Sequence, residues 1–207
     1  DLARLNALSG KSQAPKPAKA DSRSLLGNAL QILQRSGVEA ALQELRRISD
    51  EPGAAHVPYS RRMVLLATAA ASAYPGAAMR LCEVVSNSED ATPEAWLMAG
   101  ALQDRLGERP AAARSMLAVL RSGDSSAVQR LRAANLLVRF GQQALALSEA
   151  KRAFEALGKP IEHAATLLYI AQVTADWPLV SELTSLLEAG YRKGLAALIN
   201  ESPRTHV

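Results

Sequence analysis

The stretch "AWLMAGALQDRLGERPAAARSMLAVLR", residues 95–121, decides the fold of this chain. It places its largest ring at Trp96 and small side chains at Ala99, Gly100 and Ala112. A lone amphipathic helix needs only one apolar stripe and has no use for small residues at fixed places. Small residues let two helices approach closely, so the stretch predicts a helical hairpin.

The same hairpin pattern recurs along the chain. Gly107, in the turn of the stretch, has counterparts further on at Gly141 and Ala175 and an earlier one at Ala73, all separated by the same interval. The places five residues after and seven residues before this turn are also filled by small or aliphatic residues: Ala78, Ala112, Ala146 and Val180 after it, and Leu66, Gly100, Ala134 and Leu168 before it. A constant interval of this length is typical of stacked helical hairpins.

Apolar residues recur at helical spacing from Ser24 onward, with turn residues between the segments. The expected helix pairs are 24–36 with 38–49, 59–73 with 76–87, 93–106 with 109–121, 126–140 with 142–156, and 161–174 with 177–189. A last helix is expected near 191–200, ending before Ser202 and Pro203. No segment sustains an alternation of apolar and polar residues, so no sheet is expected.

Three regions are expected from the composition along the chain. Residues 1–22 contain "GKSQAPKPAKADS", which predicts a short helix followed by an extended Pro/Lys linker. Residues 23–190 form the helical repeat domain, and residues 191–207 form a C-terminal helix and a tail. Because the chain starts at Asp1, we expect it to be a segment of a longer protein.

The overall composition limits the classes of function. Hydrophobic residues make up 48% of the chain but aromatic residues only 4%, which favours helices of alanine, leucine and valine. No apolar run reaches the roughly 18 residues of a membrane span, so a cytoplasmic location is expected. The net charge of +4 comes from scattered basic pairs typical of solvated helix surfaces. Aromatic residues that could stack on bases are few, and no nucleic-acid partner is expected.

No catalytic or cofactor motif is evident. The single cysteine, Cys82, excludes an internal disulfide and is expected to be a small core residue. The histidines His56, His163 and His206 lack the spacing of metal ligands, so no metal is expected. "SGKS", residues 9–12, lacks the earlier glycine of a phosphate-binding loop. The segment is therefore predicted to have no enzymatic activity and no cofactor.

Four residues stand at positions that resemble those of a known repeat family. Trp96, Gly100, Gly107 and Ala112 occupy the fourth, eighth, fifteenth and twentieth places of a unit that resembles the tetratricopeptide repeat (TPR). The resemblance covers about residues 24–190 and is degenerate: Arg130, for example, stands at a fourth place that is usually large and apolar. It implies an all-α fold, a right-handed α-solenoid of about five stacked antiparallel helix pairs plus a C-terminal helix. Other helical repeats of similar length, or an ordinary bundle, remain alternatives.

In the TPR pattern, fixed places of each first helix line a concave groove, and these places give the candidate partner-binding residues of this chain. The candidates are Met63, Leu97 and Leu131 at the fifth place, Asn135 and Tyr169 at the ninth, and Asp104, Arg105, Arg139 and Gln172 at the twelfth and thirteenth. Asn135 would bond the backbone of a bound peptide, and the arginines would bind carboxylates. In the alternative interpretation, Leu97 and Leu131 are core residues.

The resemblance implies a non-catalytic protein-interaction scaffold that binds a peptide or helix of a partner protein in the groove. One alternative is the substrate-recruiting arm of a larger bacterial enzyme, such as a protein glycosyltransferase, with a further domain of the same chain beyond Val207. Another is an assembly factor for a secretion or pilus system, tethered to an upstream membrane anchor. Assembly into a homo-oligomer is a further alternative.

Overall fold

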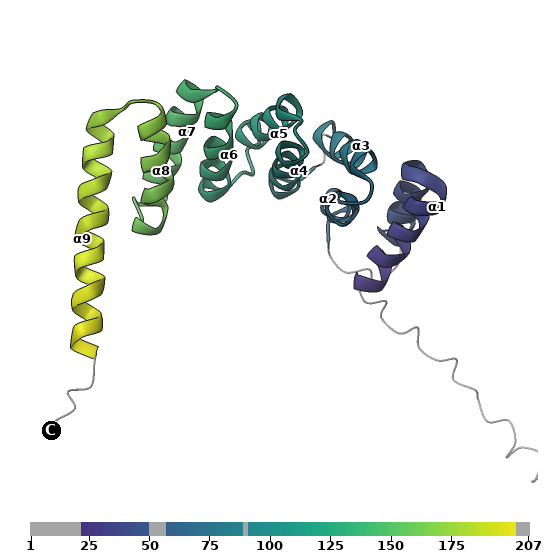
Figure 1. Ribbon diagram of the computed structural model, residues 1–207, viewed down its shortest axis with the longest axis horizontal. Helices are drawn as coiled ribbons and strands as arrows, with labels where there is room; N and C mark the ends of the chain where they lie inside the picture. The colour runs from purple at the N-terminus through teal and green to yellow at the C-terminus, as the bar shows by residue number, and fades with distance from the viewer. Residues whose placement is uncertain (1–21, 50–56, 89–90, 202–207) are drawn as a thin grey trace, which may run out of the picture. The chain divides into compact units, whose positions relative to one another are not determined.

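The computed structural model describes residues 22–49, 57–88 and 91–201, and every regular element in these ranges is an α-helix (Figure 1). The expectation of an all-α fold is therefore confirmed for the described residues. The chain divides into two compact units, one up to Val57 and one from Pro58 onward. This division falls inside the range 23–190 that was expected to form one domain. The prediction of a linker in residues 1–21 lies outside the described residues.

The described part of the first unit is α1, Ser22–Ser49. Its backbone leaves helical geometry at Gly37, whose φ of +85° lies in the left-handed region. This turn separates two helical segments where the sequence predicted a break between residues 36 and 38. The buried apolar residues of these segments are Ala29, Leu33, Ala41, Leu42, Leu45 and Ile48.

The second unit consists of hairpins in which the helices start at a constant interval. The first helices are α2 (Tyr59–Ala70), α4 (Pro93–Arg105), α6 (Ala127–Arg139) and α8 (Ile161–Val173). The second helices are α3 (Pro75–Ser86), α5 (Arg109–Arg121), α7 (Gln143–Ala156) and α9 (Trp177–Glu201). The interval from one helix start to the next is the same throughout both series and equals the interval between Gly107 and Gly141. The predicted spacing is therefore confirmed for these helix starts.

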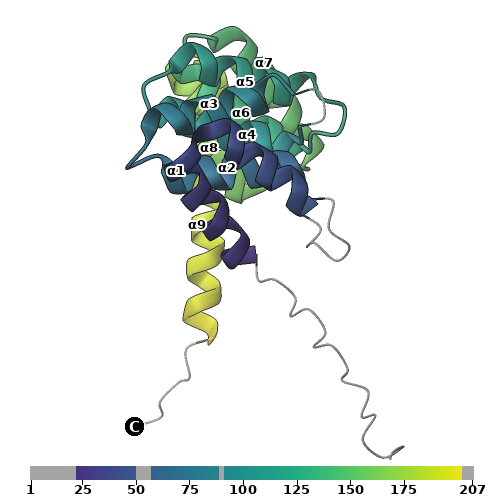
Figure 2. The ribbon, with the colours of Figure 1, turned by 90° about the vertical axis from the view of Figure 1, so that its right-hand side faces the viewer.

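Neighbouring helices pack in a repeated pattern within this unit. Each first helix packs on the second helix of its own hairpin, and α3, α5 and α7 each pack on the first helix that follows. The first helices also contact one another, α2 with α4, α4 with α6 and α6 with α8. Figures 1 and 2 show the first helices along one side of the unit and α3, α5 and α7 along the other.

The turn after each of α4, α6 and α8 has the same geometry. Gly107, Gly141 and Ala175 have φ values of +89°, +79° and +56°. At Gly107, the backbone N–H donates to the carbonyl of Asp104 at 3.0 Å, and the next N–H, of Glu108, donates to the carbonyl of Gln103 at 2.8 Å. The same two bonds close the turns at Gly141 and Ala175. This pair of bonds satisfies carbonyls that the helix end leaves without partners.

The turn after α2 differs from the other three. Ala73 is not in the left-handed region, and the N–H groups of Ala73 and Tyr74 both donate to the carbonyl of Ala70. Pro75 follows Tyr74 and restricts the backbone of the residue before it. The proposed equivalence of Ala73 with Gly107 therefore holds for the position in the chain but not for the local conformation.

At the left-handed turn positions, replacing alanine by glycine should stabilise the protein and replacing glycine by alanine should destabilise it. Ala175→Gly should raise the free energy of unfolding by about 1 kcal/mol, because glycine adopts a positive φ without the steric cost that alanine has. Gly107→Ala and Gly141→Ala should lower it by a similar amount. Urea unfolding followed by circular dichroism measures all three variants. A loss of stability in Ala175→Gly would contradict this account of the turn.

Gly100 marks the closest approach of α4 to α5. A Cβ atom at this position would overlap Cε of Met116 and would lie 3.0 Å from Cβ of Ser115. The end of the buried Met116 side chain would have to move, and the carbonyl oxygen of Ala112 at 3.2 Å would crowd the added atom further, so packing favours glycine at this place. Ala134 stands at the equivalent place of α6 and is fully buried, so the α6–α7 hairpin accommodates the methyl group that the α4–α5 hairpin excludes.

Gly100→Ala should therefore lower the free energy of unfolding by about 1–3 kcal/mol. The matched control is Gly76→Ala, in the first turn of α3, where an added Cβ meets no atom within 4 Å. That control should be neutral or stabilising, because alanine is the better helix former. Thermal or urea unfolding of both variants tests the pair, and equal losses of stability would contradict the close approach.

The last helix differs from the prediction. Instead of a second helix ending near 189 and a separate one near 191–200, α9 continues without a break to Glu201. In the preceding hairpin, Gly158 at φ +79° and Pro160 follow the end of α7, and α9 has Arg192 and Gly194 at these places. Without a left-handed glycine or a proline, the helix has no local signal to stop.

Gly190, between the two helices expected here, lies inside α9 and faces α8. A Cβ atom there would overlap Cδ1 of Ile161, so the glycine makes room for the first residue of α8 against α9. A glycine in a helical sequence here lies beneath a side chain of the neighbouring helix and does not end its own helix.

Candidate functional site

The three apolar candidates for partner binding are buried. The exposed fractions of Met63, Leu97 and Leu131 are 1%, 9% and 2%, and Leu97 and Leu131 belong to the hydrophobic core. Their assignment to an open groove is therefore wrong, and the alternative interpretation of the two leucines as core residues holds. The physical reason is that α4 and α6 pack on each other and α6 packs on α8, and this contact covers the fifth place of the helix.

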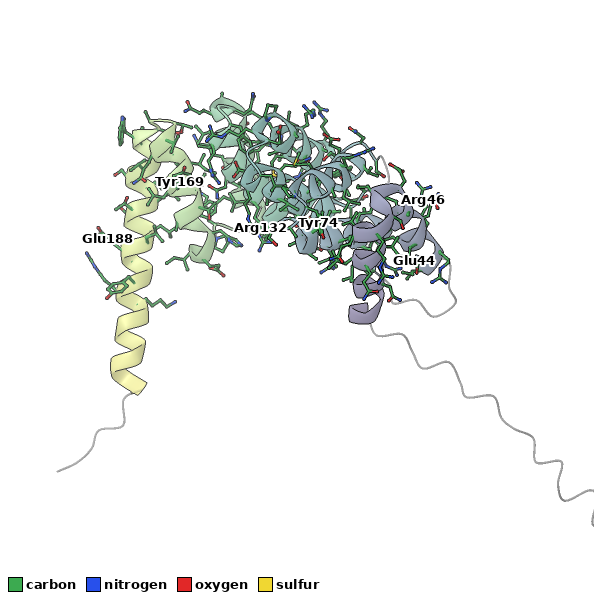
Figure 3. All side chains as sticks on the ribbon, turned by 45° about the vertical axis from the view of Figure 1, so that its right-hand side comes forward. Glu44, Arg46, Tyr74, Arg132, Tyr169 and Glu188 are labelled. Atoms are coloured by element: carbon green, nitrogen blue, oxygen red, sulfur yellow. The ribbon has the colours of Figure 1, made fainter. Side chains whose placement is uncertain are left out.

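The six polar or aromatic candidates are at least partly exposed and come from α4, α6 and α8. Together with Arg132, which the sequence reasoning missed, and Val173, which stands at the thirteenth place of the same pattern, they form what we name the first-helix surface: Asp104, Arg105, Arg132, Asn135, Arg139, Tyr169, Gln172 and Val173. Figure 3 labels Arg132 on α6 and Tyr169 on α8. Because α4 contacts α6 and α6 contacts α8, these residues lie on neighbouring helices.

The missed residue, Arg132, had a signal in the sequence. Arg132 precedes Asn135 by three residues and Arg139 by seven, which places all three on one face of α6. Val173 follows Tyr169 by four residues on α8. Helical periodicity around Asn135 would have identified Arg132, which lies at none of the fixed places that the family pattern names, whereas Val173 stands at the thirteenth place of that pattern.

An ion pair joins two of the predicted residues. Nη1 of Arg139 lies 3.0 Å from Oδ2 of Asp104, which links α6 to α4. The Asp104 side chain is only 10% exposed, whereas the Arg139 side chain is 51% exposed. The carboxylate of Asp104 is therefore already neutralised by the protein itself and lies largely beneath the guanidinium group.

Asn135 has an unsatisfied polar atom. Its side-chain oxygen Oδ1 is buried and accepts no hydrogen bond from any residue in the described ranges. Leaving such an acceptor without a donor costs about 1–3 kcal/mol. Asn135 lies one helical turn before Arg139, and the residue as a whole is partly exposed. An unsatisfied buried acceptor lowers the stability of the free protein, and such residues are found where they serve a function.

Arg105 borders a cavity between α2 and α4. The cavity has a volume of about 320 Å³ and is lined, besides Arg105, by Thr68, Ala71, Ser72, Leu102 and Leu106. The Thr68 hydroxyl donates to the carbonyl of Val64 at 2.8 Å. Arg105 makes no ion pair with any residue that the structure describes.

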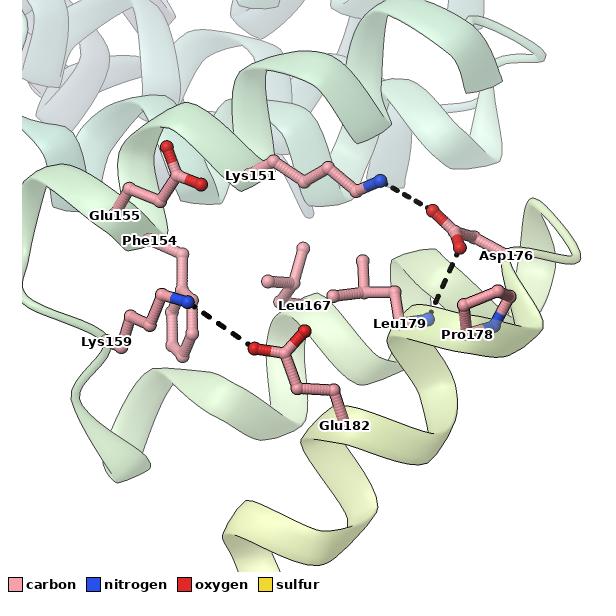
Figure 4. Close-up of a pocket in the computed structure, with 9 residues that line it drawn as sticks. All are labelled: Lys151, Phe154, Glu155, Lys159, Leu167, Asp176, Pro178, Leu179 and Glu182. Carbon is pink, nitrogen blue, oxygen red and sulfur yellow. Dashed lines mark hydrogen bonds and ion pairs between the residues drawn. The ribbon is translucent and has the colours of Figure 1, made fainter.

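A second cavity, also of about 320 Å³, lies between α7 and the last hairpin (Figure 4). Phe154, Leu167 and Leu179 supply its apolar lining. Two ion pairs cross it: Nζ of Lys151 lies 2.6 Å from Oδ2 of Asp176, and Nζ of Lys159 lies 3.4 Å from Oε1 of Glu182. Four of its charged groups thus satisfy one another in pairs that join α7 and the turn after it to the last hairpin, and Glu155 also lines the cavity.

Asp176 combines this ion pair with a helix cap. Its Oδ1 accepts a hydrogen bond from the backbone N–H of Leu179, in the first turn of α9. The hydrogen bond from Lys151 lowers the pKa of Asp176 below its ordinary value of 3.8, desolvation opposes that effect, and the N–H of Leu179 lowers the pKa further. The charged carboxylate is therefore the form that the folded protein favours.

Because the folded-state pKa of Asp176 is depressed, its stabilising contribution is present above pH 3.8 and is lost as the pH falls through the folded value. Asp176→Asn should be less stable than the wild type at pH 7, and the difference should shrink as the pH is lowered below 4. Urea unfolding at pH 7 and at several acidic pH values measures the difference. A gap that stays constant down to pH 2 would contradict the assigned interaction.

Arg130 is structural rather than part of the site. It stands at the fourth place of its hairpin, where Trp96 stands in the preceding one. Trp96 donates from Nε1 to the carbonyl of Val85 at 3.2 Å, and Arg130 donates to the carbonyls of Leu120 at 3.0 Å and Ser122 at 2.9 Å. Both side chains thus satisfy carbonyls at the end of the preceding second helix, and the positive charge of Arg130 suits that end.

The titratable groups in the described ranges offer no assembled centre. No group of three or more His, Cys, Asp or Glu residues within these ranges is placed to hold a metal ion. Cys82 is buried, as predicted, and burial raises the pKa of its thiol to about 12, so the thiolate is disfavoured. His163 lies in α8, and His56 and His206 lie outside the described residues.

Within the described ranges, no helix has both the length and the apolarity that crossing a membrane requires. Comparison of the chain with protein-family models, with curated proteins and with solved structures finds no match. The candidate site therefore stands on its own geometry: basic, aromatic and amide side chains of three neighbouring helices, among them one buried acceptor that no described residue satisfies.

Proposed function

We propose that this chain is a non-catalytic scaffold that binds an extended segment of a partner protein along the first-helix surface. The observation that carries the proposal is the buried Oδ1 of Asn135, which has no donor among the described residues. A bound peptide offers a backbone N–H at regular intervals and can supply that donor when the Asn135 side chain turns outward, because Oδ1 has almost no solvent exposure in the free protein. The amide of Asn135 can also donate to a peptide carbonyl through Nδ2.

We also propose that the second unit is a right-handed α-solenoid of the TPR type. The constant start-to-start spacing of both helix series supports this architecture, as do the equivalent turns at Gly107, Gly141 and Ala175. The contacts between successive first helices support it further. In such a solenoid the first helices line the concave wall, where an extended chain contacts several repeats at once.

The residue types of the surface favour a protein partner. Arginine and tyrosine are enriched where proteins bind one another, because each combines a polar group with a large contact area. Tyr169 is 43% exposed, and Val173 lies exposed one turn further along α8. The burial of Met63, Leu97 and Leu131 removes the apolar stripe that a partner helix would need, so an extended peptide is the better fit.

The test begins with selection of linear peptides from a display library on the immobilised protein. Selected peptides are then measured against Asn135→Leu and Tyr169→Ala by calorimetry or fluorescence anisotropy. Asn135→Leu should raise the thermal midpoint of the free protein, because it removes an unsatisfied acceptor, and should weaken peptide binding about tenfold. Tyr169→Ala should weaken binding with little change in stability.

The matched control is Leu145→Ser, which changes an exposed apolar residue of comparable exposure on the second helix α7. This variant should bind the selected peptides as the wild type does. A screen that yields no specific peptide would overturn the proposed function. Peptides that bind Asn135→Leu and Tyr169→Ala as tightly as the wild type would place binding elsewhere.

A further inference from the structure

The constant spacing of the first helices makes Arg105 and Arg139 equivalent positions of successive repeats. Each is the last residue of its helix, α4 and α6 respectively. At Arg139 the preceding first helix supplies a carboxylate, that of Asp104, at 3.0 Å. At one of the two equivalent positions, Arg139, the protein itself therefore pairs the arginine with a carboxylate.

The same place beside Arg105 holds no carboxylate. The residue equivalent to Asp104 in α2 is Ala70, which is fully buried and ends its helix. The cavity of about 320 Å³ that Arg105 borders lies at this end of α2, where Ala71 and Ser72, the two residues after Ala70, line it. The exposed Ser72 also lines this cavity, and its hydroxyl is a hydrogen-bond donor.

We propose that the cavity beside Arg105 binds the carboxylate of an aspartate or glutamate side chain of the partner peptide, in the role that Asp104 has beside Arg139. This inference rests on the proposed function and assigns the chemistry of the partner. The guanidinium group presents a planar fork of donors that matches a carboxylate, and Ser72 supplies a further donor. Leu102 and Leu106 provide an apolar wall for the methylene groups of the acidic side chain.

The charge of the surrounding surface agrees with an acidic segment. Arg132 is exposed on α6, and Arg139 is half exposed above its pair with Asp104. The carboxylate of Asp104, in contrast, is largely covered. A partner segment therefore meets exposed guanidinium groups on α4 and α6, so acidic side chains are favoured over basic ones.

A side-chain carboxylate fits better than a phosphate. The group that occupies the equivalent place is the carboxylate of a short side chain, held by one arginine. Among the residues that line the cavity, Arg105 is the one with a positive charge, whereas a phosphate carries up to two negative charges.

The experiment follows the side-chain Nε–Hε signals of the arginines by NMR in ¹⁵N-labelled protein. The probe is the capped pentapeptide acetyl-Ala-Ala-Asp-Ala-Ala-amide, and its asparagine counterpart is the matched control ligand. The Arg105 signal should shift with the aspartate peptide, with an affinity about tenfold or more above that of the asparagine peptide. The Arg139 signal should remain in place, since its partner position is occupied, and exposed Arg132 reports non-specific attraction.

Two variants sharpen the result. Arg105→Gln should abolish the preference for aspartate over asparagine, with little effect on folding because the residue is exposed. Asp104→Asn should leave Arg139 without its carboxylate and so create a second responding site, at which the Arg139 signal shifts with the aspartate peptide. A gain of binding of this kind is not produced by a general loss of structure.

Three outcomes would overturn the inference: equal responses to the two peptides, equal shifts at Arg132 and Arg105, or no response of Arg139 in Asp104→Asn. A response as strong to inorganic phosphate, or to an alanine peptide with a free C-terminus, would show a general anion site and would also overturn it. If display-selected peptides bind but Arg105→Gln leaves their affinity unchanged, the carboxylate assignment fails while the proposed function stands.

Discussion

Three of the four hairpins in the second unit share one backbone constraint, a residue in the left-handed region just after the first helix. Gly107, Gly141 and Ala175 meet it, and each closes its helix with the same two N–H to carbonyl bonds. Because the chain reverses at the same place, the second helix starts at the same residue of each unit and presents its side chains in the same register. After α2, where Ala73 is not in the left-handed region, the helix start is kept but the conformation of the turn is not.

A constant backbone register allows the same position to serve different purposes in successive hairpins. Trp96 and Arg130 occupy one such position and satisfy carbonyls of the preceding helix through an indole and a guanidinium group. Gly100 and Ala134 occupy another, and the α4–α5 hairpin is the more closely packed. Comparison between equivalent positions therefore separates the residues that the fold requires from those that differ between hairpins. Arg105 stands out in that comparison, because Ala70 occupies the position equivalent to Asp104, the partner of Arg139.

The first-helix surface contains a group that the fold does not need. Buried polar atoms in folded proteins normally have partners, and Oδ1 of Asn135 has none among the described residues. An aliphatic residue at this place would remove the cost, as the buried aliphatic neighbours on α6 illustrate. Under the proposed function, stability and binding make opposite demands at Asn135, and this opposition would distinguish a recognition residue from one that supports the core.

The amino-acid sequence by itself determined the helices, their spacing and the turn at Gly107, because these follow from local propensity, periodicity and glycine conformation. It also identified Asn135, Arg139 and Tyr169, since their places on the first helix are read from the repeat. Only the tertiary structure decided that Leu97 and Leu131 are core residues, because neighbouring first helices cover them. It alone revealed the pairing of Asp104 with Arg139, the cavity beside Arg105 and the unsatisfied oxygen of Asn135, since each arises where residues distant in sequence meet.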